Sequence, residues 1–171
     1  LDVLALDADA DRLKRVDDTL ARLHLQGRTL AADARDTAAW WDGQPFDAIL
    51  LDAPCSASGI VRRHPDVRWL RRASDITELA RTQTGLLEAL WPLLKPGGRL
   101  LYATCSIFRA EGAGQISSFL QRHPEARALR APGHLLPLPD NRVEAAGATS
   151  SPAAGSGDGF FYALLHKSPA S

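Results

Sequence analysis

One stretch, residues 46–59, constrains the fold of this chain more than any other. It reads Phe-Asp-Ala-Ile-Leu-Leu-Asp-Ala-Pro-Cys-Ser-Ala-Ser-Gly. Its four consecutive apolar residues, 48–51, are typical of a strand that is buried on both faces, and the run stops at Asp52. Pro54 and Gly59, which follow, favour an irregular loop. We therefore predict a buried strand that leads into a loop carrying Asp52 and Cys55.

A second predicted strand, residues 99–104, ends in the same way at Cys105. The two cysteines of the chain, Cys55 and Cys105, thus both follow buried strands. In open α/β sheets ligands bind at the carboxyl ends of the strands, so thiols there are candidates for chemistry. A single cysteine is more often a small buried hydrophobe than a nucleophile. The matched placement, beside Asp52 and near arginines that can lower a thiol pKa, favours a reactive role.

Strand-like and helix-like segments alternate along the chain. Apolar runs predict strands at 3–7, 28–32, 46–51, 99–104 and 160–165, and helical spacing predicts helices within 9–27, 74–94 and 111–121, with a helical turn at 36–41. We expect Asp9 and Ser74 to cap the first two helices, and Gly27 and residues 95–98 to end them. Residues 131–159 are predicted to form a long loop. This order predicts an α/β fold with a parallel, doubly wound sheet, whose last strand is at the edge or next to it.

Length and composition narrow the class of protein. The 171 residues suffice for one domain, and 45% of them are hydrophobic, as in globular proteins. The sequence has neither an apolar run of about 18 residues nor a leader, so we expect a cytoplasmic protein without a membrane contact. Both cysteines are then expected to be free thiols. The net charge of zero argues against nucleic-acid binding through bulk charge, though not against a local basic patch.

The start of the sequence suggests a fragment. The chain has no methionine and begins at Leu1, directly before a strand-like run. No Gly-x-Gly follows an early strand, so the glycine-rich turn that cradles part of a nucleotide is missing. We expect the parent protein to supply further residues of the same sheet.

Three predicted strands end in an acidic residue: Asp7, Asp33 and Asp52. Aspartate is a common first residue of loops, which explains any one of them. Because the carboxyl ends of parallel strands lie along one rim, we expect the three carboxylates to face a common crevice. Carboxylates at such positions typically accept hydrogen bonds from ribose hydroxyls and exocyclic amines of nucleotides.

An arginine-rich segment follows the loop that carries Cys55. Its arginines are Arg62, Arg63, Arg68, Arg71 and Arg72, interleaved with His64 and Trp69. This composition is typical of a phosphate clamp with an aromatic platform. A solvated loop whose arginines cap the next helix is the simpler alternative. The five histidines have no ligand spacing, so we expect no metal.

Several motifs together resemble one family of enzymes. They are, in chain order, Asp52-Ala-Pro-Cys-Ser-Ala-Ser-Gly59, Arg62-Arg-His-Pro-Asp66, Trp69-Leu-Arg-Arg72, Leu94-Lys-Pro-Gly-Gly98 and Tyr102-Ala-Thr-Cys-Ser106. From Val3 to the Gly-Asp-Gly-Phe-Phe-Tyr ending at Tyr162, the chain resembles the Sun-type (RsmB-type) bacterial 16S ribosomal RNA cytosine-5 methyltransferases. Paired Pro-Cys and Thr-Cys motifs are highly specific to RNA cytosine-5 methyltransferases.

The resemblance implies a Rossmann-like, class I methyltransferase fold that uses S-adenosylmethionine. Residues 1–171 would be part of the catalytic domain, without its first strand and glycine-rich loop and without the family's N-terminal RNA-binding domain. Asp7 would hold the ribose of the cofactor, Asp33 would lie by the adenine, and Asp52 would lie between cofactor and target base.

The resemblance also implies the reaction. The parent protein would transfer a methyl group to C5 of a cytosine in small-subunit ribosomal RNA, while this fragment alone would be inactive. Cys105 corresponds to the nucleophile that adds to C6, and Cys55 to the cysteine that assists release. Of the arginines, Arg62, Arg63 and Arg68 would contact RNA phosphates.

Two other interpretations stay open. In a DNA cytosine-5 methyltransferase a Pro-Cys thiol such as Cys55 is itself the nucleophile, and the Thr104-Cys105 pair argues against this reading. The chain can also be a non-catalytic RNA-binding fragment in which both cysteines are structural.

Overall fold

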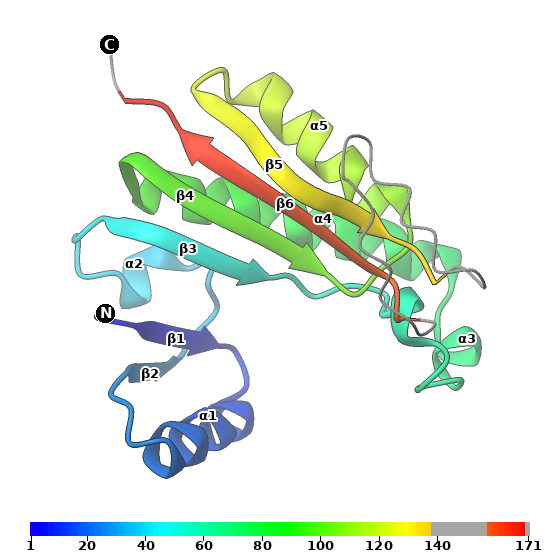
Figure 1. Cartoon of the computed structure of the whole chain (residues 1–171), viewed down its shortest axis with the longest axis horizontal. Coiled ribbons are helices and arrows are strands. Elements are labelled where there is room, and N and C mark those ends of the chain that lie inside the picture. The colour runs from blue at the N-terminus through cyan, green and yellow to red at the C-terminus, as the bar shows by residue number, and fades with distance from the viewer. Residues whose placement is uncertain (138–156, 170–171) are drawn as a thin grey trace. The chain divides into compact units, whose positions relative to one another are not determined.

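The computed structural model of the chain describes residues 1–137 and 157–169, which divide into two units (Figure 1). The first unit is Leu1–Gln44 and the second is Pro45–Ser171. Within these described residues each unit has its own sheet, with two strands in the first unit and four in the second.

The first unit is a β-α-β arrangement. Its elements are β1 (Leu4–Asp7), α1 (Ala10–Arg22), β2 (Arg28–Ala31) and the short α2 (Thr37–Trp40). Strands β1 and β2 pair in parallel, with Asp7 opposite Ala31. As expected, the side chain of Asp9 caps α1 by accepting hydrogen bonds from the backbone N–H groups of the first turn. The predicted helical turn is confirmed as α2.

Helix α1 ends before the residue predicted to stop it. The expected stop was Gly27, but the helix ends at Arg22. His24 adopts a left-handed φ of 53°, which breaks the helical path, and the Leu25 N–H bonds back to the carbonyl of Leu20 at 2.9 Å. A non-glycine residue thus takes the conformation for which glycine is favoured at helix ends.

The second unit contains a four-stranded sheet in the order β3-β4-β6-β5. Its strands are β3 (Phe46–Asp52), β4 (Leu94–Thr104), β5 (Ala126–Leu135) and β6 (Phe160–Lys167). β3 and β4 are parallel, whereas β6 runs antiparallel to both β4 and β5. The expectation of a parallel sheet is therefore wrong for its last two strands, while the α/β class is confirmed.

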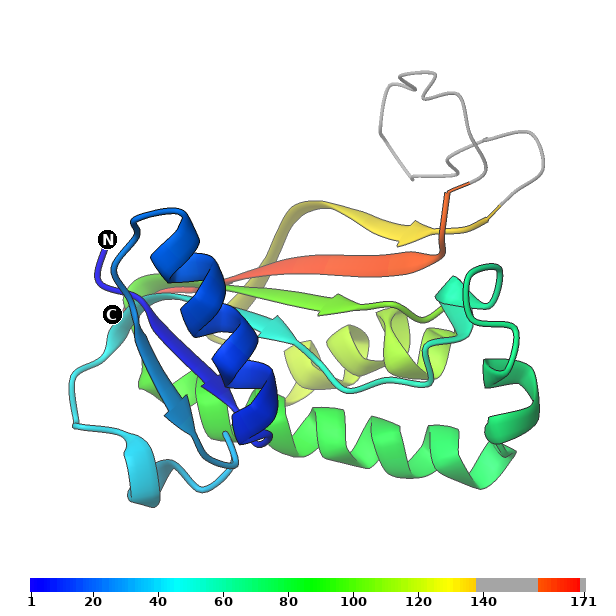
Figure 2. The same ribbon diagram turned by 90° about the horizontal axis from the view of Figure 1, so that it is seen from below.

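Helices α4 (Ala73–Leu90) and α5 (Ala113–Arg122) lie against the same face of this sheet (Figure 2). Shorter helical segments connect the main elements: η1 (Ser58–Ile60), α3 (Val67–Leu70), η2 (Trp91–Leu93) and η3 (Arg109–Glu111). Trp91 and Phe119 meet edge to face, with ring centroids 5.2 Å apart, and both are buried. Ile116 is also buried, as the helical spacing predicted. None of the described helices combines the length and apolar character that a membrane span requires.

The ends of α4 differ from the prediction. Ser74 is not the cap: the helix follows Arg72, whose backbone N–H donates to the Asp75 carboxylate at 2.9 Å. At the other end η2 and its Pro92 intervene, and Leu94 already belongs to β4, opposite Phe46. Proline cannot donate the backbone bond that would continue an α-helix, which explains the earlier end.

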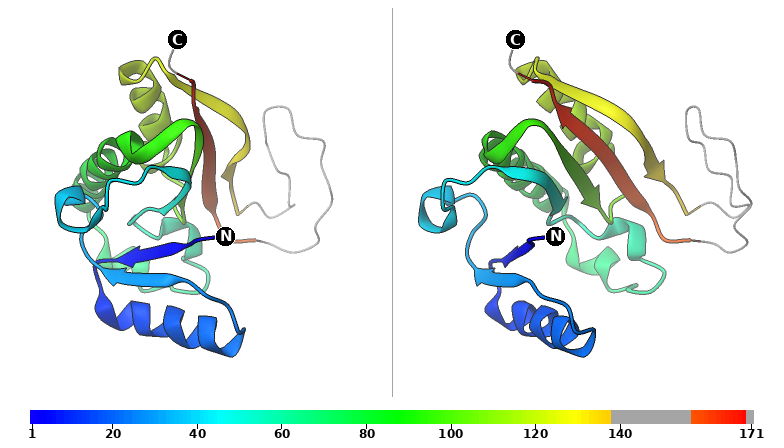
Figure 3. Two further views of the ribbon diagram at one scale, coloured as in Figure 1. Left: turned by 90° about the vertical axis from the view of Figure 1, so that its left-hand side faces the viewer. Right: turned by 60° about the vertical axis from the view of Figure 1, so that its left-hand side comes forward.

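Strand β5 was missed because its sequence does not look like a strand. Residues 131–159 were predicted to be a loop, yet β5 extends to Leu135, and Figure 3 shows β6 between β4 and β5. Pro132 and Gly133 disfavour regular strands, and here they fall at a register shift between Leu129 and Gly133. β6 is thus the strand next to the edge, as expected. The rest of the predicted loop, residues 138–156, lies outside the described residues.

Strand β3 is less buried than its apolar run predicted. Leu51 is 7% exposed, but Leu50 is 69% exposed. β3 is the first strand of its sheet, and among the described residues no strand pairs with its outer edge. Among the described residues, β1 pairs only with β2.

Candidate active site

The two cysteines meet at the ends of β3 and β4. Their Sγ atoms lie 3.3 Å apart, and both are free, partly exposed thiols. The pairing of the two parallel strands continues to Asp52, opposite Ala103, so the loops that follow start side by side. The Gly59 N–H then donates to the carbonyl of Cys105 at 3.0 Å, which joins the two loops a second time. The expected pairing of the thiols at one end of the sheet is confirmed.

The close contact separates the acidities of the two thiols. The pKa of Cys105 falls to about 7 because the Cys55 thiol donates a hydrogen bond to it, although burial and the negative charges of Asp52 and Glu111 oppose this shift. The pKa of Cys55 rises because of the same hydrogen bond and because of burial. The sequence predicts that arginines lower the pKa of a thiol here, but the pKa of Cys105 is lowered by the Cys55 thiol. At neutral pH Cys105 is therefore the more readily ionised of the two thiols.

Asp52 is the last residue of β3 and is exposed. It lies close enough to Cys105 for its charge to raise the pKa of that thiol. The structure thus brings Asp52 together with both cysteines, as the strand-end argument predicted.

Asp7 and Asp33 belong to the first unit, where Asp7 is the last residue of β1 and Asp33 follows the parallel strand β2. Asp7 Oδ1 accepts the Asp9 N–H at 2.8 Å. Both Asp33 oxygens accept hydrogen bonds from the Arg35 guanidinium, at 2.7 to 3.2 Å, and these bonds lower the pKa of Asp33 to about 2. A crevice shared by these residues and Asp52 stays a prediction.

The predicted RNA-binding arginines Arg62, Arg63 and Arg68 are all exposed. Arg63 forms an ion pair with Asp158, whose side chain is only 8% exposed. Arg71, which was not singled out among them, donates from Nε to the carbonyl of Ser56 at 3.1 Å. One arginine of the segment thus supports the loop that carries Cys55.

A buried polar cluster beneath the cysteines was not predicted. It consists of Ser56, Ser58, Ser106 and Glu111, of which all but Ser58 are fully buried. A glutamate is usually at the surface, and the sequence pattern predicts only a helix that starts at Glu111. The one signal in the sequence is that serine directly follows both cysteines.

Gly159 packs against the loop that carries Cys55. Its N–H donates to the carbonyl of Gly59 at 2.8 Å. A Cβ placed on Gly59 would lie 1.9 Å from the carbonyl oxygen of Gly159, so only glycine fits there. Gly159 therefore has a packing role just before β6.

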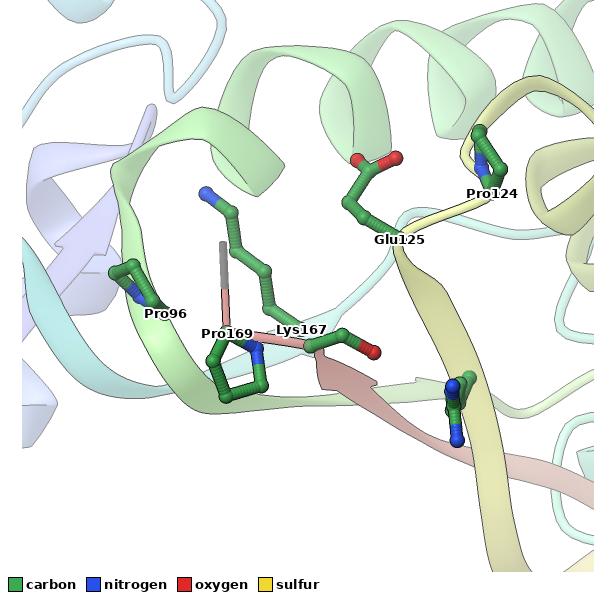
Figure 4. A pocket seen from close by; sticks show the side chains of 7 residues that line it. Pro96, Pro124, Glu125, Lys167 and Pro169 are labelled. Carbon is green, nitrogen blue, oxygen red and sulfur yellow. The ribbon is translucent and has the colours of Figure 1, made fainter. Parts of the chain in front are cut away.

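A cavity of about 390 Å³ lies at the other end of β4 (Figure 4). Pro96, Glu125 and Lys167 are among its lining residues. The Lys167 ammonium donates to the carbonyl of Leu94 at 2.8 Å, so it stabilises the start of β4. This cavity contains none of the predicted site residues. The described residues also hold no group of three or more His, Cys, Asp or Glu that suits a metal ion.

Comparison with known proteins decides the family. The family described as 16S rRNA methyltransferase RsmB/F matches residues 1–166. The chain belongs to this family. Among its curated relatives, the ribosomal RNA small subunit methyltransferase B of Vibrio vulnificus is 49% identical over 166 residues, and that of Salmonella arizonae is 52% identical over 166 residues. Each alignment covers 97% of this chain but 37% of the relative, so the chain spans little more than a third of these proteins.

Solved structures agree with the class I methyltransferase fold. PH0851 superposes with a TM-score of 0.78 at 36% identity, over 97% of this chain and 37% of that one. NSun6 from Pyrococcus horikoshii, solved with SFG, gives a TM-score of 0.72 at 26% identity, over 97% of this chain and 41% of that one. The expected Rossmann-like fold class is therefore confirmed.

Proposed function

We propose that the full-length protein containing this chain transfers a methyl group from S-adenosylmethionine to C5 of a cytosine in 16S ribosomal RNA. The observation that carries the proposal is the thiol pair: the Sγ atoms of Cys55 and Cys105 lie 3.3 Å apart, and the hydrogen bond between them lowers the Cys105 pKa to about 7. Family membership supports ribosomal RNA methylation, and the thiol pair supports chemistry through a covalent adduct.

Residues of the first unit suit the proposed cofactor. Asp7 and Asp33 lie at the carboxyl ends of parallel strands, where ribose hydroxyls and exocyclic amines are bound in sheets of this kind. The carboxylate of Asp33 pairs with the Arg35 guanidinium, and this ion pair is exposed. Because exposed ion pairs contribute little free energy, a ligand can replace Arg35 as the partner of Asp33. Bound S-adenosylmethionine supplies an electrophilic methyl group on a sulfonium. We assign Asp7 to the ribose and Asp33 to the adenine side.

Cys105 makes C5 of the base reactive. C5 of cytosine is a poor nucleophile, so the Cys105 thiolate first adds to C6, forming a C–S bond and making C5 an enamine carbon. Asp52, at the end of β3, is placed to hydrogen-bond the N3/N4 edge and to stabilise this adduct. The target base must leave its stack to reach the thiol.

Cys55 assists the release of the product. Transfer of the methyl group from the sulfonium to C5 would leave S-adenosylhomocysteine. A base then takes the C5 proton, the electron pair of the C5–H bond restores the C5–C6 double bond, and the C6–S bond breaks. The sulfur of Cys105 leaves as a thiolate. Cys55 lies 3.3 Å from that sulfur and can donate its S–H to it, as it does in the free protein.

The RNA contacts are assigned to the segment after Cys55. Arg62, Arg63 and Arg68 are exposed and can pair with phosphates, and the neighbouring Trp69 is 87% exposed and can stack on a base. The full-length protein would supply the first strand of the catalytic domain and, as a separate N-terminal domain, an RNA-binding domain. A ribosomal RNA substrate implies a cytoplasmic protein.

Two variants of the full-length protein test the proposal. Cys105→Ala removes the nucleophile, so it should abolish methyl transfer and form no RNA adduct. Cys55→Ala should still form the bond through Cys105 but release it slowly, so RNA-linked protein should accumulate on a denaturing gel. An adduct in Cys105→Ala and none in Cys55→Ala would make Cys55 the nucleophile, as in DNA cytosine-5 methyltransferases. Full activity in both variants would refute thiol catalysis.

A further inference from the structure

A single buried carboxylate lies beneath both cysteine loops. Glu111 is fully buried at the end of η3. Its Oε2 accepts hydrogen bonds from the hydroxyls of Ser56 and Ser106, each at 2.6 Å. Ser56 directly follows Cys55, and Ser106 directly follows Cys105. One side chain therefore bonds to the neighbour of each thiol.

Further contacts fix this carboxylate in place. Its Oε1 accepts the backbone N–H of Ser56 at 2.8 Å and the side-chain amide of Gln83 at 3.3 Å. Gln83 also donates to the carbonyl of Pro54 at 2.9 Å, and the Tyr102 hydroxyl donates to the main-chain carbonyl of Glu111 at 2.9 Å. A buried carboxylate costs several kcal/mol unless it is bonded in this way. The cluster therefore holds together only when both loops are in this arrangement.

We propose that Glu111 is a positioning residue for the two thiols: by bonding to Ser56 and Ser106, it fixes the separation at which Cys55 donates to Cys105. Its importance for methyl transfer rests on the proposed function, because Cys105 must be the nucleophile. Its effect on the thiols themselves does not, and it can be measured without RNA.

Glu111 acts on Cys105 in two opposite directions. Its negative charge raises the Cys105 pKa, as does the charge of Asp52. By holding Cys55 in place, it permits the thiol hydrogen bond that lowers this pKa, which is the larger effect. Replacing the carboxylate with an amide of the same shape therefore distinguishes the two roles. A purely electrostatic role predicts a lower Cys105 pKa, and a positioning role predicts a higher one.

The experiment uses Glu111→Gln in the full-length protein. Glu78→Gln is the matched control, because Glu78 is exposed on α4 and pairs only with Arg81 among the described residues. The Cys105 pKa is read from the pH dependence of iodoacetamide alkylation, with the Cys105 peptide quantified by mass spectrometry. We expect it to rise from about 7 toward the ordinary value of about 8.5. Alkylation at neutral pH should then slow roughly tenfold, with no change in Glu78→Gln.

A double variant makes the inference specific. If Glu111 acts through Cys55, then Glu111→Gln should no longer raise the Cys105 pKa when Cys55→Ala is already present. An unchanged or lowered pKa in folded Glu111→Gln would overturn the inference. A rise that persists in the Cys55→Ala background would overturn it as well.

A gentler change covers the case in which Glu111→Gln does not fold. Ser106→Ala removes one hydrogen bond to the Glu111 carboxylate and leaves the charge of the carboxylate in place. Ser117→Ala, which changes an exposed serine of α5, is the matched control. We expect a smaller rise of the Cys105 pKa in Ser106→Ala alone, and no rise there would contradict the positioning role. If Cys105→Ala retained methyl transfer, the proposed function would fail, but this result on the thiols would be unaffected.

Discussion

Gly159 and Gly59 contact each other through their backbones, with the Gly159 N–H donating to the Gly59 carbonyl at 2.8 Å. The contact joins the start of β6 to the loop that carries Cys55. Any side chain on Gly59 would meet the Gly159 backbone, which cannot move aside as the end of a flexible side chain would.

We therefore expect Gly59→Ala to destabilise the protein by about 1 to 3 kcal/mol, as overpacked sites do. Urea unfolding followed by circular dichroism measures the change. Gly157→Ala is the control, because nothing lies within 4 Å of a Cβ at that position. Equal stability of the two variants would show that the close contact between Gly59 and Gly159 does not contribute to the free energy of unfolding.

The acidity of Cys105 should depend on Cys55. In Cys55→Ala the donated hydrogen bond is lost, so the Cys105 pKa should rise from about 7 toward about 8.5. The rate of alkylation at neutral pH should fall roughly tenfold, and the rates should converge at high pH, where both proteins carry the thiolate. A pH profile that stays the same would mean that the thiols act independently.

Asp33 should titrate at unusually low pH. Its pKa is lowered from 3.8 to about 2, chiefly by the side-chain hydrogen bond from Arg35. Because the pKa is lower in the folded state, the ion pair stabilises the protein above about pH 4 and is lost as the pH falls through about 2. The pair is exposed, so the stabilisation is small. In Arg35→Ala, an NMR titration should show the Asp33 pKa rising from about 2, but it should stay below the ordinary value because the backbone N–H of residue 35 still donates to Asp33 Oδ1. An unshifted titration would refute the pairing.

The arginine segment should govern the salt dependence of RNA binding. Replacing Arg62, Arg63 and Arg68 with alanine in the full-length protein should weaken binding and reduce the slope of log K against log salt by about 0.7 for each lost single-stranded phosphate contact. Arg81→Ala, which removes an exposed arginine of α4, is the matched control. Unchanged slopes in the triple variant would leave these arginines as surface residues.

Much of the site follows from local sequence, because each cysteine comes directly after an apolar strand and parallel strands end at one rim. Strand β5 could not be predicted, since Pro132 and Gly133 disfavour a strand and are accommodated only by the register shift against β6. Glu111 could not be predicted either, because its burial depends on serines that are 5 and 55 residues away. Leu50 and Leu51 point to opposite faces of the sheet, and an apolar run does not encode which face is covered.

The measurement that tests the mechanism most directly is the location of the RNA bond in Cys55→Ala. The full-length variant is incubated with 16S ribosomal RNA and S-adenosylmethionine above about pH 8.5, where Cys105 is ionised even without Cys55. After nuclease and protease digestion, mass spectrometry identifies the peptide that carries a methylated cytidine. We predict that this nucleotide is attached to Cys105. A trapped nucleotide on any other residue, or an adduct that forms equally well in Cys55→Ala/Cys105→Ala, would contradict the assignment of Cys105 as the nucleophile.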